Sequence, residues 1–408
     1  MTFDVAAIRS HFPALAAGAA HFDGPGGSQT PDVVARAVHD TLVSPIANRG
    51  SVTVAEQNAE GVVLAARSAM ADLLGSDPRG IVFGRSMTQL TFDISRALAK
   101  TWSPGDEVVV SRLDHDANVR PWVIAAENAR AKVRWIDFDP ASAELTSRHV
   151  ADQLTDRTRL VAITGASNLI GTRPDLAAAA DQVHRAGALF YVDGVHLTAH
   201  STIDVTALGA DFFACSPYKF FGPHCGVVAA SPDLLDSLHP DKLLPSTDAV
   251  PERFELGTLP YELLAGTTAA VDFIAGLADI AGTADTAGAA GDRRQRILTS
   301  MRSVDVHEDS LRQRIERDLA ELPSITLHSR ARSRTPTLLL TFQDAAVQDA
   351  YRFLGELGVN APAGTFYAYE PARRLGLDSG GLRVGLAPYT SEQDVDRLLD
   401  GLTKFVGG

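Results

Sequence analysis

Short apolar runs recur between residues 81 and 230 of the chain, and longer Ala- and Leu-rich segments separate most of them. The runs have the length and the β-branched or aromatic content of strands, and the intervening segments, such as 87–100, 120–130 and 174–186, are helix-sized. Strands that are apolar on both faces are typical of a sheet covered by helices on both sides. The pattern therefore predicts an α/β fold with a mainly parallel seven-stranded sheet. The predicted strands are 81–83, 107–111, 132–137, 160–164, 189–193, 212–215 and 226–230.

The C-terminal part of the chain has a different pattern. Residues 276–292 are dominated by Ala, Gly, Thr and Asp, which indicates a loose connection. A charged helix is expected from about Asp292 to Glu321, followed by strands at 337–342 and 381–386. A chain of 408 residues favours two domains. We expect a large domain, 25–264, and a smaller α+β domain formed by 1–24 and 265–408.

Charge and cysteine content restrict the partners and the location. The net charge of −13 argues against nucleic acid or an anionic membrane surface as a partner, since both would repel the chain. With only two cysteines, Cys215 and Cys225, no disulfide framework is expected, and a reducing cytoplasmic location is favoured. The N-terminus does not have the pattern of a signal peptide, and the strand-sized apolar runs predict no membrane span.

Lys219 is the first candidate for chemistry. It lies in the segment Cys215-Ser-Pro-Tyr-Lys-Phe-Phe-Gly-Pro-His-Cys-Gly226, directly after a predicted buried strand. Burial between aromatic groups lowers the pKa of an amine and makes it a better nucleophile toward an aldehyde. Most lysines in such a setting are simply solvated, so the neighbouring motifs decide the matter.

Asp193 is the second candidate, because it ends the predicted strand 189–193. A carboxylate at that position is costly unless it is paired, and open α/β sheets bind ligands at this edge. A carboxylate paired with a pyridine nitrogen keeps that nitrogen protonated, so that the ring can accept electrons. Together with Lys219, this points to pyridoxal 5'-phosphate (PLP) as cofactor. The alternative role for Asp193 is that of a helix N-cap.

Three further segments fit a planar, phosphorylated cofactor. The strand 81–83 passes through Gly84 into a helix start at Met87 and Thr88, whose free N–H groups can bind phosphate. His115 could stack on a ring, and Asn168 could donate a hydrogen bond to a phenolate oxygen. No P-loop occurs, and 24–29 fails the dinucleotide spacing. A metal site at 114–116 is disfavoured, because adjacent residues point in different directions.

In this order, these elements resemble the class V aminotransferases, within the fold-type I PLP-dependent transferases. The resemblance is to the cysteine-desulfurase-like branch in particular. It covers nearly the whole chain, from His21-Phe-Asp-Gly-Pro-Gly-Gly-Ser-Gln-Thr-Pro31 to Leu382-Arg-Val-Gly-Leu-Ala-Pro-Tyr-Thr-Ser-Glu-Gln-Asp-Val-Asp396. The resemblance implies a fold-type I architecture and PLP as cofactor.

The resemblance also implies roles for single residues. Lys219 would hold PLP as a Schiff base and shuttle the α-proton, Asp193 would pair with the pyridine nitrogen, and His115 would stack over the ring. Arg383 would take the substrate carboxylate through its two-pronged guanidinium. The other implied contacts are Asn168 and His196 (a glutamine in desulfurases) near the phenolic oxygen, Met87, Thr88, Ser216 and Tyr218 (a histidine in desulfurases) at the phosphate, and Thr258 at the phosphate of the neighbouring subunit. The last contact implies a homodimer.

One departure from the branch concerns sulfur chemistry. Desulfurases carry a persulfide-forming cysteine on a mobile C-terminal loop, and the corresponding stretch here is Gly358-Val-Asn-Ala-Pro-Ala-Gly-Thr-Phe-Tyr-Ala368. Tyr367 stands at or next to the cysteine position, where it could shape or protonate the leaving-group side. A tyrosine cannot form a persulfide. Cys215 and Cys225 flank the lysine motif instead, so ordinary desulfurase turnover is not expected.

Three functions follow from these observations. The first is a PLP-dependent lyase that eliminates a β-substituent from a cysteine-like amino acid, in the manner of a C–S lyase. The second is a class V aminotransferase or amino-acid epimerase. An aminotransferase often needs a second anion-binding group, for which Arg85, Arg120 and Arg173 are candidates that the sequence does not place. The third, a non-catalytic binding homologue, is disfavoured by the retention of the lysine, aspartate, histidine and arginine named above.

Overall fold

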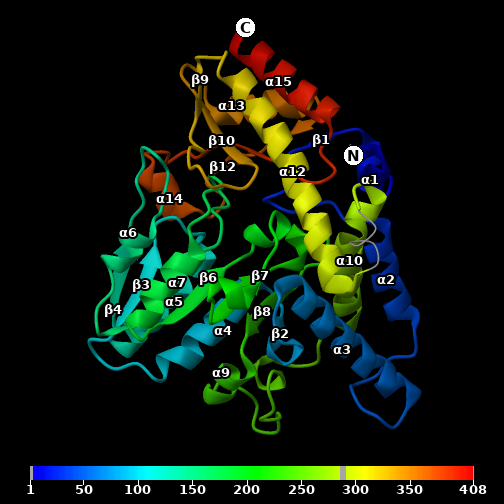
Figure 1. Cartoon of the computed structure of the whole chain (residues 1–408), viewed down its shortest axis with the longest axis vertical. Coiled ribbons are helices and arrows are strands. Elements are labelled where there is room, and N and C mark those ends of the chain that lie inside the picture. Colours follow the sequence, from blue (N-terminus) through cyan, green and yellow to red (C-terminus); the bar gives the residue numbers. More distant parts are fainter. Residues whose placement is uncertain (1–2, 285–290, 408) are drawn as a thin grey trace.

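The computed structural model describes residues 3–284 and 291–407 (Figure 1). Its largest element is a seven-stranded sheet with the strand order β2-β8-β7-β6-β5-β3-β4. Neighbouring strands are parallel except that β8 runs antiparallel to both β2 and β7. The predicted mainly parallel sheet is confirmed. Its strands are β2 (Ile81–Gly84), β3 (Glu107–Ser111), β4 (Lys132–Ile136), β5 (Thr158–Thr164), β6 (Leu189–Asp193), β7 (Phe212–Cys215) and β8 (Gly226–Ala230).

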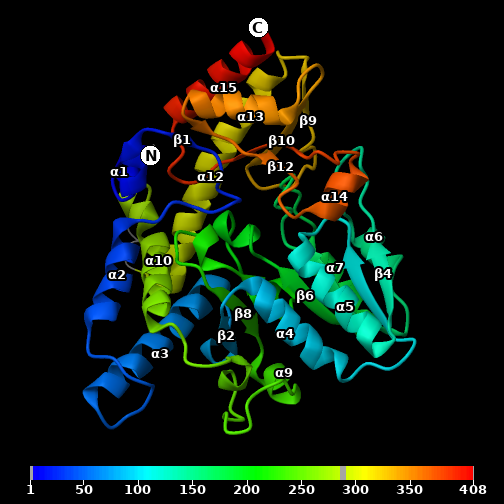
Figure 2. The ribbon, with the colours of Figure 1, turned by 180° about the vertical axis from the view of Figure 1, so that it is seen from behind.

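Helices cover both faces of this sheet, because alternate residues of its strands are apolar on opposite sides. In β6, for example, Phe190 and Val192 belong to one apolar cluster and Tyr191 to the other. Figure 2 shows α4 and α5 on one side of the sheet. The helices around the sheet are α2 (Asp32–Val43), α3 (Val54–Leu74), α4 (Met87–Ala99), α5 (Arg120–Ala129), α6 (Ser147–Ala151), α7 (Leu176–Arg185), α8 (Val205–Leu208), α9 (Pro232–Ser237) and α10 (Tyr261–Ile280).

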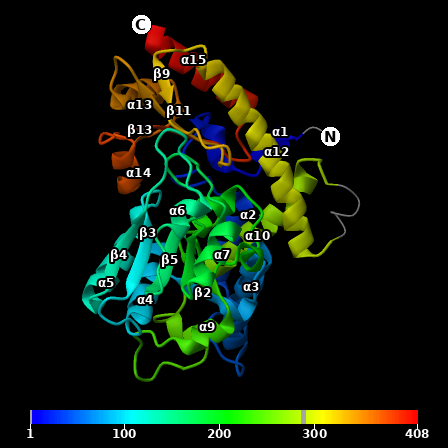
Figure 3. The same ribbon diagram turned by 60° about the vertical axis from the view of Figure 1, so that its left-hand side comes forward.

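The C-terminal region forms a second, four-stranded antiparallel sheet with the order β12-β13-β10-β9. The long charged helix α12 (Arg293–Leu319) runs from beside α10 up to this region (Figure 3). A third apolar cluster fills the space between the sheet and its helices. The elements are β9 (Ile325–Leu327), β10 (Thr337–Phe342), α13 (Val347–Glu356), β11 (Val359–Asn360), β12 (Ala363–Gly364), α14 (Tyr369–Arg374), β13 (Gly381–Gly385) and α15 (Glu392–Gly407).

The N-terminal residues lie against this C-terminal region. After α1 (Val5–Arg9), the short strand β1 (Ala20–His21) pairs in parallel with β11, and Asp23 forms a bridge with Gly385. The division of the chain at 24/25 and 264/265 stays a prediction, and the second position lies inside α10.

The predicted loose connection 276–292 is wrong in its first part. Residues 276–280 form the last turns of α10, because Leu277 and Ala278 continue its buried apolar face. The stretch 285–290 lies outside the described residues, and α12 begins at Arg293, close to the predicted start. Among the described residues, α10 is the one helix long and apolar enough to cross a membrane by length and composition. It contacts α2, α3 and α12, which is the surrounding of a core helix.

The carboxyl ends of the parallel strands meet at one edge of the large sheet. Thr164 of β5, Asp193 of β6 and Ala214 of β7 are register neighbours there. This is the edge at which open α/β sheets bind ligands.

Candidate active site

A cavity of about 620 Å³ opens at this edge of the sheet. Of the twelve side chains predicted for the site, eleven line it, namely Met87, Thr88, His115, Asn168, Asp193, His196, Ser216, Tyr218, Lys219, Tyr367 and Arg383. The twelfth, Thr258, is exposed on the loop between Phe254 and α10, outside this cavity. Its predicted contact with a neighbouring subunit stays a prediction.

Lys219 ends a short 3-10 turn, Pro217–Lys219, that directly follows β7. Its Nζ donates hydrogen bonds to the carbonyl oxygens of Pro25 and Gly26, so the amine is held by backbone carbonyls of the N-terminal segment. Burial and the nearby charge of Arg383 lower the pKa of Lys219 to about 8. About a tenth of this amine is therefore uncharged at pH 7, which is the form that a nucleophile or base requires.

Asp193 is fully enclosed at the end of β6. Its Oδ1 accepts a hydrogen bond from the backbone N–H of Val195 at 2.9 Å, while Oδ2 has no hydrogen-bond partner among the described residues. Burial raises the pKa of this carboxyl to about 6. A buried carboxylate with a free oxygen stabilises a protonated ring nitrogen placed beside it.

The N-terminus of α4 provides an anion-binding position. Ser86 caps the helix by accepting the N–H of Gln89 at 3.1 Å. The N–H groups of Met87 and Thr88 lie in the first turn, where no intrahelical acceptor exists, and both residues line the cavity. Gly226 of β8 allows this arrangement, since a Cβ atom there would lie 2.2 Å from the carbonyl carbon of Ser86.

His115 lies on the wall of the cavity with its ring 5.6 Å from that of Tyr367. Its Nδ1 accepts the N–H of Ala117 at 3.0 Å. Burial, followed by the charge of Lys219, lowers the pKa of His115 to about 4. The ring is therefore neutral at pH 7, which suits stacking on another planar ring.

The acidic residues beside His115 face other partners. Asp114 is buried and accepts hydrogen bonds from Ser111 and Asn118, and Asp116 pairs with Arg120 at 3.1 Å. Within 3–284 and 291–407, no group of three or more His, Cys, Asp or Glu side chains is placed to hold a metal ion.

Arg383 reaches the cavity from β13 and is almost fully buried, with 2% of its surface exposed. Its guanidinium donates to Asp23 Oδ1 at 2.7 Å and to the carbonyl of Asn168 at 3.1 Å. It also lies 3.6 Å from the centroid of the Phe366 ring. Neither Asp23 nor Phe366 was predicted from the sequence, although Asp23 stands in the segment 21–31, where the resemblance to the family begins.

Phe366 and Tyr367 both have left-handed backbone conformations, with φ of 53° and 56°. Non-glycine residues held in this way cost about 1–3 kcal/mol each and cluster at functional sites. Two hydrogen bonds hold the segment, from Asn168 Nδ2 to the carbonyl of Phe366 at 3.0 Å and from the N–H of Asp116 to the carbonyl of Tyr367 at 2.8 Å. The stretch aligned with the sulfur-acceptor loop is thus docked across the cavity.

His196 is held from behind by the C-terminal region. Its Nε2 lies 2.9 Å from the hydroxyls of both Thr335 and Thr337, and burial lowers its pKa well below the usual value. The ring is therefore a neutral hydrogen-bonding group. The neighbouring His200, which follows β6 by one short turn, is also buried. Its Nδ1 lies 2.9 Å from Oε2 of Glu308 in α12.

Tyr218 lies between His224 and Lys219, and its predicted contact with the phosphate stays a prediction. Its ring stacks on His224 with centroids 4.6 Å apart and planes 10° from parallel. The Nζ of Lys219 lies 4.6 Å from the centroid of the same ring. Tyr218 also lines the cavity.

Comparison with known proteins identifies the family. The family model for class-V aminotransferases matches residues 20–398. The chain belongs to the class-V aminotransferase family. The chain is 31% identical to an uncharacterized Mycobacterium tuberculosis protein, MT3887, over 99% of this chain and 100% of the relative. It is 30% identical to the aminotransferase-like protein FGM3 of Gibberella zeae, over 98% of both chains.

A solved structure matches the whole fold. The crystal structure of the cysteine desulfurase CsdA from Escherichia coli superposes with a TM-score of 0.85 at 27% identity, covering 100% of this chain and 99% of that one. The resemblance inferred from the sequence is confirmed, and this class-V protein is a PLP-dependent enzyme of the cysteine-desulfurase-like type. The disfavoured alternative, a non-catalytic homologue, is therefore set aside.

The cavity itself fits PLP. Asp193 lines the cavity and offers an oxygen without a hydrogen-bond partner among the described residues for a ring nitrogen, and α4 offers N–H groups for a phosphate. Asn168 Oδ1 is buried and has no hydrogen-bond partner among the described residues, so a polar group of a bound molecule can satisfy it.

Proposed function

We propose that this class-V enzyme is a PLP-dependent lyase that eliminates a β-substituent from a cysteine-like amino acid. The observation that carries the proposal is the lack of a usable thiol. The chain has two cysteines, and both are buried, with 0% and 2% of their surface exposed. Burial raises the pKa of Cys225 to about 11 and that of Cys215 well above its usual value, so neither supplies a thiolate. The segment 358–368, which has Tyr367 and no cysteine, supports the same conclusion.

The chain's own residues would divide the work of elimination. When bound, PLP supplies an electron sink at the substrate α-carbon. Lys219 Nζ would take the α-proton, since its lowered pKa leaves the amine partly uncharged at neutral pH. The Cβ–substituent bond would then break, with its electron pair and a proton leaving on the substituent. Hydrolysis of the remaining unsaturated amino acid gives pyruvate and ammonium, which balances the reaction.

The remaining proposed roles are those of binding. Asp193 would hold the ring nitrogen, and His115 would stack on the ring. Asn168 and His196 would lie beside the phenolic oxygen. Met87, Thr88, Ser216 and Tyr218 would hold the phosphate. Arg383 would bind the substrate carboxylate. Because its guanidinium already donates to Asp23, Arg383 must bind both carboxylates at once or exchange Asp23 for the substrate.

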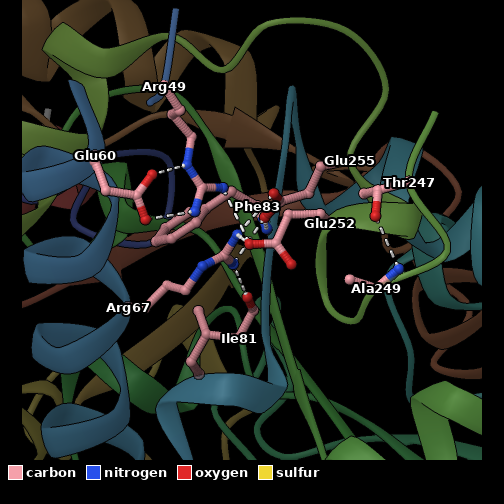
Figure 4. Close-up of polar contacts among 9 residues, drawn as sticks. All are labelled: Arg49, Glu60, Arg67, Ile81, Phe83, Thr247, Ala249, Glu252 and Glu255. Atoms are coloured by element: carbon pink, nitrogen blue, oxygen red, sulfur yellow. Dashed lines mark hydrogen bonds and ion pairs between the residues drawn. The ribbon is translucent and has the colours of Figure 1, made fainter. Parts of the chain in front are cut away.

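We also propose a cytoplasmic homodimer in which Thr258 approaches the neighbouring site. The loop before Thr258 is fixed by ion pairs, in which Arg49 joins Glu60 to Glu252 and Arg67 joins Glu252 to Glu255 (Figure 4). Large apolar side chains stand exposed close to these residues in sequence, at Val52, Leu244 and Leu256. Such exposure supports burial against a second copy.

An aminotransferase is the second candidate, and one observation favours it. Of the three arginines left open by the sequence, Arg120 lines the cavity, whereas Arg85 and Arg173 are not among the lining residues. A second cation is what an aminotransferase needs for a diacid substrate. Epimerisation begins with the same proton transfer to Lys219.

One set of incubations separates these reactions. The PLP-loaded protein is mixed with cysteine, S-substituted cysteines, alanine and aspartate, with and without an added keto acid. A lyase releases pyruvate and ammonia together with the thiol or sulfide and needs no keto acid. Amino-group transfer that depends on the keto acid, or deuterium uptake at the α-carbon with inversion and no pyruvate, would contradict the lyase. Persulfide on Cys215 or Cys225 would contradict the argument from the missing thiol.

A further inference from the structure

We propose that Arg120 is a specificity-determining residue that binds a carboxylate at the far end of the substrate's β-substituent. The inference rests on the proposed function, because it specifies which cysteine-like amino acid the lyase takes. The substrate class is then an S-substituted cysteine whose leaving thiol carries a second carboxylate.

Arg120 stands in the cavity as the first residue of α5. Asp116 and Ala117 also line the cavity, and they directly follow His115 in the sequence. The N–H of Asp116 donates to the carbonyl of Tyr367. Arg120 and Tyr367 line the cavity together, and Tyr367 is the residue that the sequence predicts on the leaving-group side.

Arg120 and Arg383 reach the cavity from different elements, α5 and β13. One molecule that spans the cavity can therefore present its α-carboxylate to Arg383 and a second anionic group to Arg120.

Arg120 is also available for a ligand. Its one side-chain partner among the described residues is Asp116, at 3.1 Å, and both side chains are partly exposed, at 44% and 31%. An exposed i,i+4 pair of this kind is weak, because water and salt screen it. A substrate carboxylate can replace Asp116 at low cost, because a guanidinium binds a carboxylate through two parallel hydrogen bonds.

The lining of the cavity agrees with a long substituent. The volume of about 620 Å³ is shared by the cofactor and the substrate, so the residues of the wall bear on the substituent more than the volume does. Phe92, Pro121 and Val195 line it together with Arg120 and offer apolar surface for a thioether chain. A substituent as small as the thiol of cysteine would leave this wall and its arginine without a contact.

The test uses ligands that bind without reacting. The PLP-loaded protein is titrated by calorimetry with 3-(carboxymethylthio)propionate, which lacks the amino group, and with its amide isostere 3-(carbamoylmethylthio)propionate. We expect the diacid to bind about tenfold more tightly, since a hydrogen-bonded charge pair contributes about 1.5 kcal/mol. Arg120→Gln should abolish this preference, and Arg120→Lys should retain part of it. Arg85→Gln removes the same charge from outside the cavity and should leave the preference unchanged.

The outcomes separate this inference from the proposed reaction. Retention of the diacid preference in Arg120→Gln, or equal binding of both ligands to the unmodified protein, would overturn the role of Arg120. Turnover of S-carboxymethyl-cysteine is measured in parallel. A diacid preference that depends on Arg120, but without release of pyruvate, would contradict the lyase and leave the subsite standing.

Discussion

The ion pair between Arg67 and Glu255 provides a quantitative test of the structure. Arg67 of α3 is 4% exposed and Glu255 is 3% exposed, and the guanidinium donates to both carboxylate oxygens, at 2.8 and 2.9 Å (Figure 4). Glu255 also accepts the N–H of Phe83 in β2 at 2.9 Å. Arg67→Met leaves this carboxylate buried without its counter-charge. Breaking a buried pair in this way costs about 3–5 kcal/mol.

The loss translates into a measurable shift of the melting temperature. With an unfolding entropy of about 2.1 cal/mol/K per residue, a chain of 408 residues has about 0.86 kcal/mol/K in total, so Arg67→Met should lower Tm by about 4–6 °C. Calorimetry of the purified variant measures it. The double variant Arg67→Met/Glu255→Gln removes the stranded charge and keeps an acceptor for Phe83, so it should melt above the single variant.

A matched control lies on the surface. Arg79 pairs with Asp77 while 76% of its side chain is exposed, so Arg79→Met should leave Tm nearly unchanged. The reasoning would be refuted if Arg67→Met melted within about 1 °C of the unmodified protein, or if the double variant melted below the single one.

Three further predictions concern the site. Burial raises the pKa of Asp193 to about 6, so this carboxyl binds its proton more tightly in the folded apoprotein than in the unfolded chain. Ionisation of Asp193 therefore destabilises the folded state. This destabilisation grows as the pH rises toward 6 and is complete above pH 6. In urea unfolding of the apoprotein, the free energy of unfolding of Asp193→Asn relative to the unmodified protein should increase between pH 4.5 and pH 7.5. The same difference at both pH values would contradict this. Asn168→Ala removes the hydrogen bond to the carbonyl of Phe366, so amide hydrogen exchange across 365–368 should accelerate. Unchanged protection would contradict the role of Asn168 in ordering this loop. Gly226→Ala places a methyl group 2.2 Å from the carbonyl carbon of Ser86, so PLP affinity should fall about tenfold or more, and full affinity would contradict the phosphate position.

The large sheet was predictable because its strands are apolar on both faces. Runs such as 107–111 and 226–230 became β3 and β8 with the expected bounds. The prediction of a loose connection at 276–292 was wrong for its first residues, because the Ala and Gly content was interpreted as that of a loop. In α10 the same small residues form a helix packed closely against α2 and α3. Composition alone does not separate a loop from a close-packed helix.

The site was predictable where a residue's role depends on its position at a strand end. Asp193 is the last residue of β6 and Lys219 ends the short turn after β7, so the neighbouring parallel strands bring them to the same edge of the sheet. Asp23 escaped the sequence analysis, because its contact with Arg383 joins positions 360 residues apart. The left-handed backbone at Phe366 and Tyr367 escaped it too, since no glycine indicates that conformation there.

The central claim is that Lys219 carries the cofactor. The chain has five lysines, and among the residues lining the cavity Lys219 is the one lysine. Borohydride reduction of the PLP-loaded protein fixes lysine-bound cofactor as a stable secondary amine, which peptide mass mapping then locates. The account predicts the added mass on the peptide that contains Lys219, and its loss together with the visible absorbance band in Lys219→Ala. A stoichiometric label on Lys100, Lys132, Lys242 or Lys404, or a visible band that survives in Lys219→Ala, would contradict it.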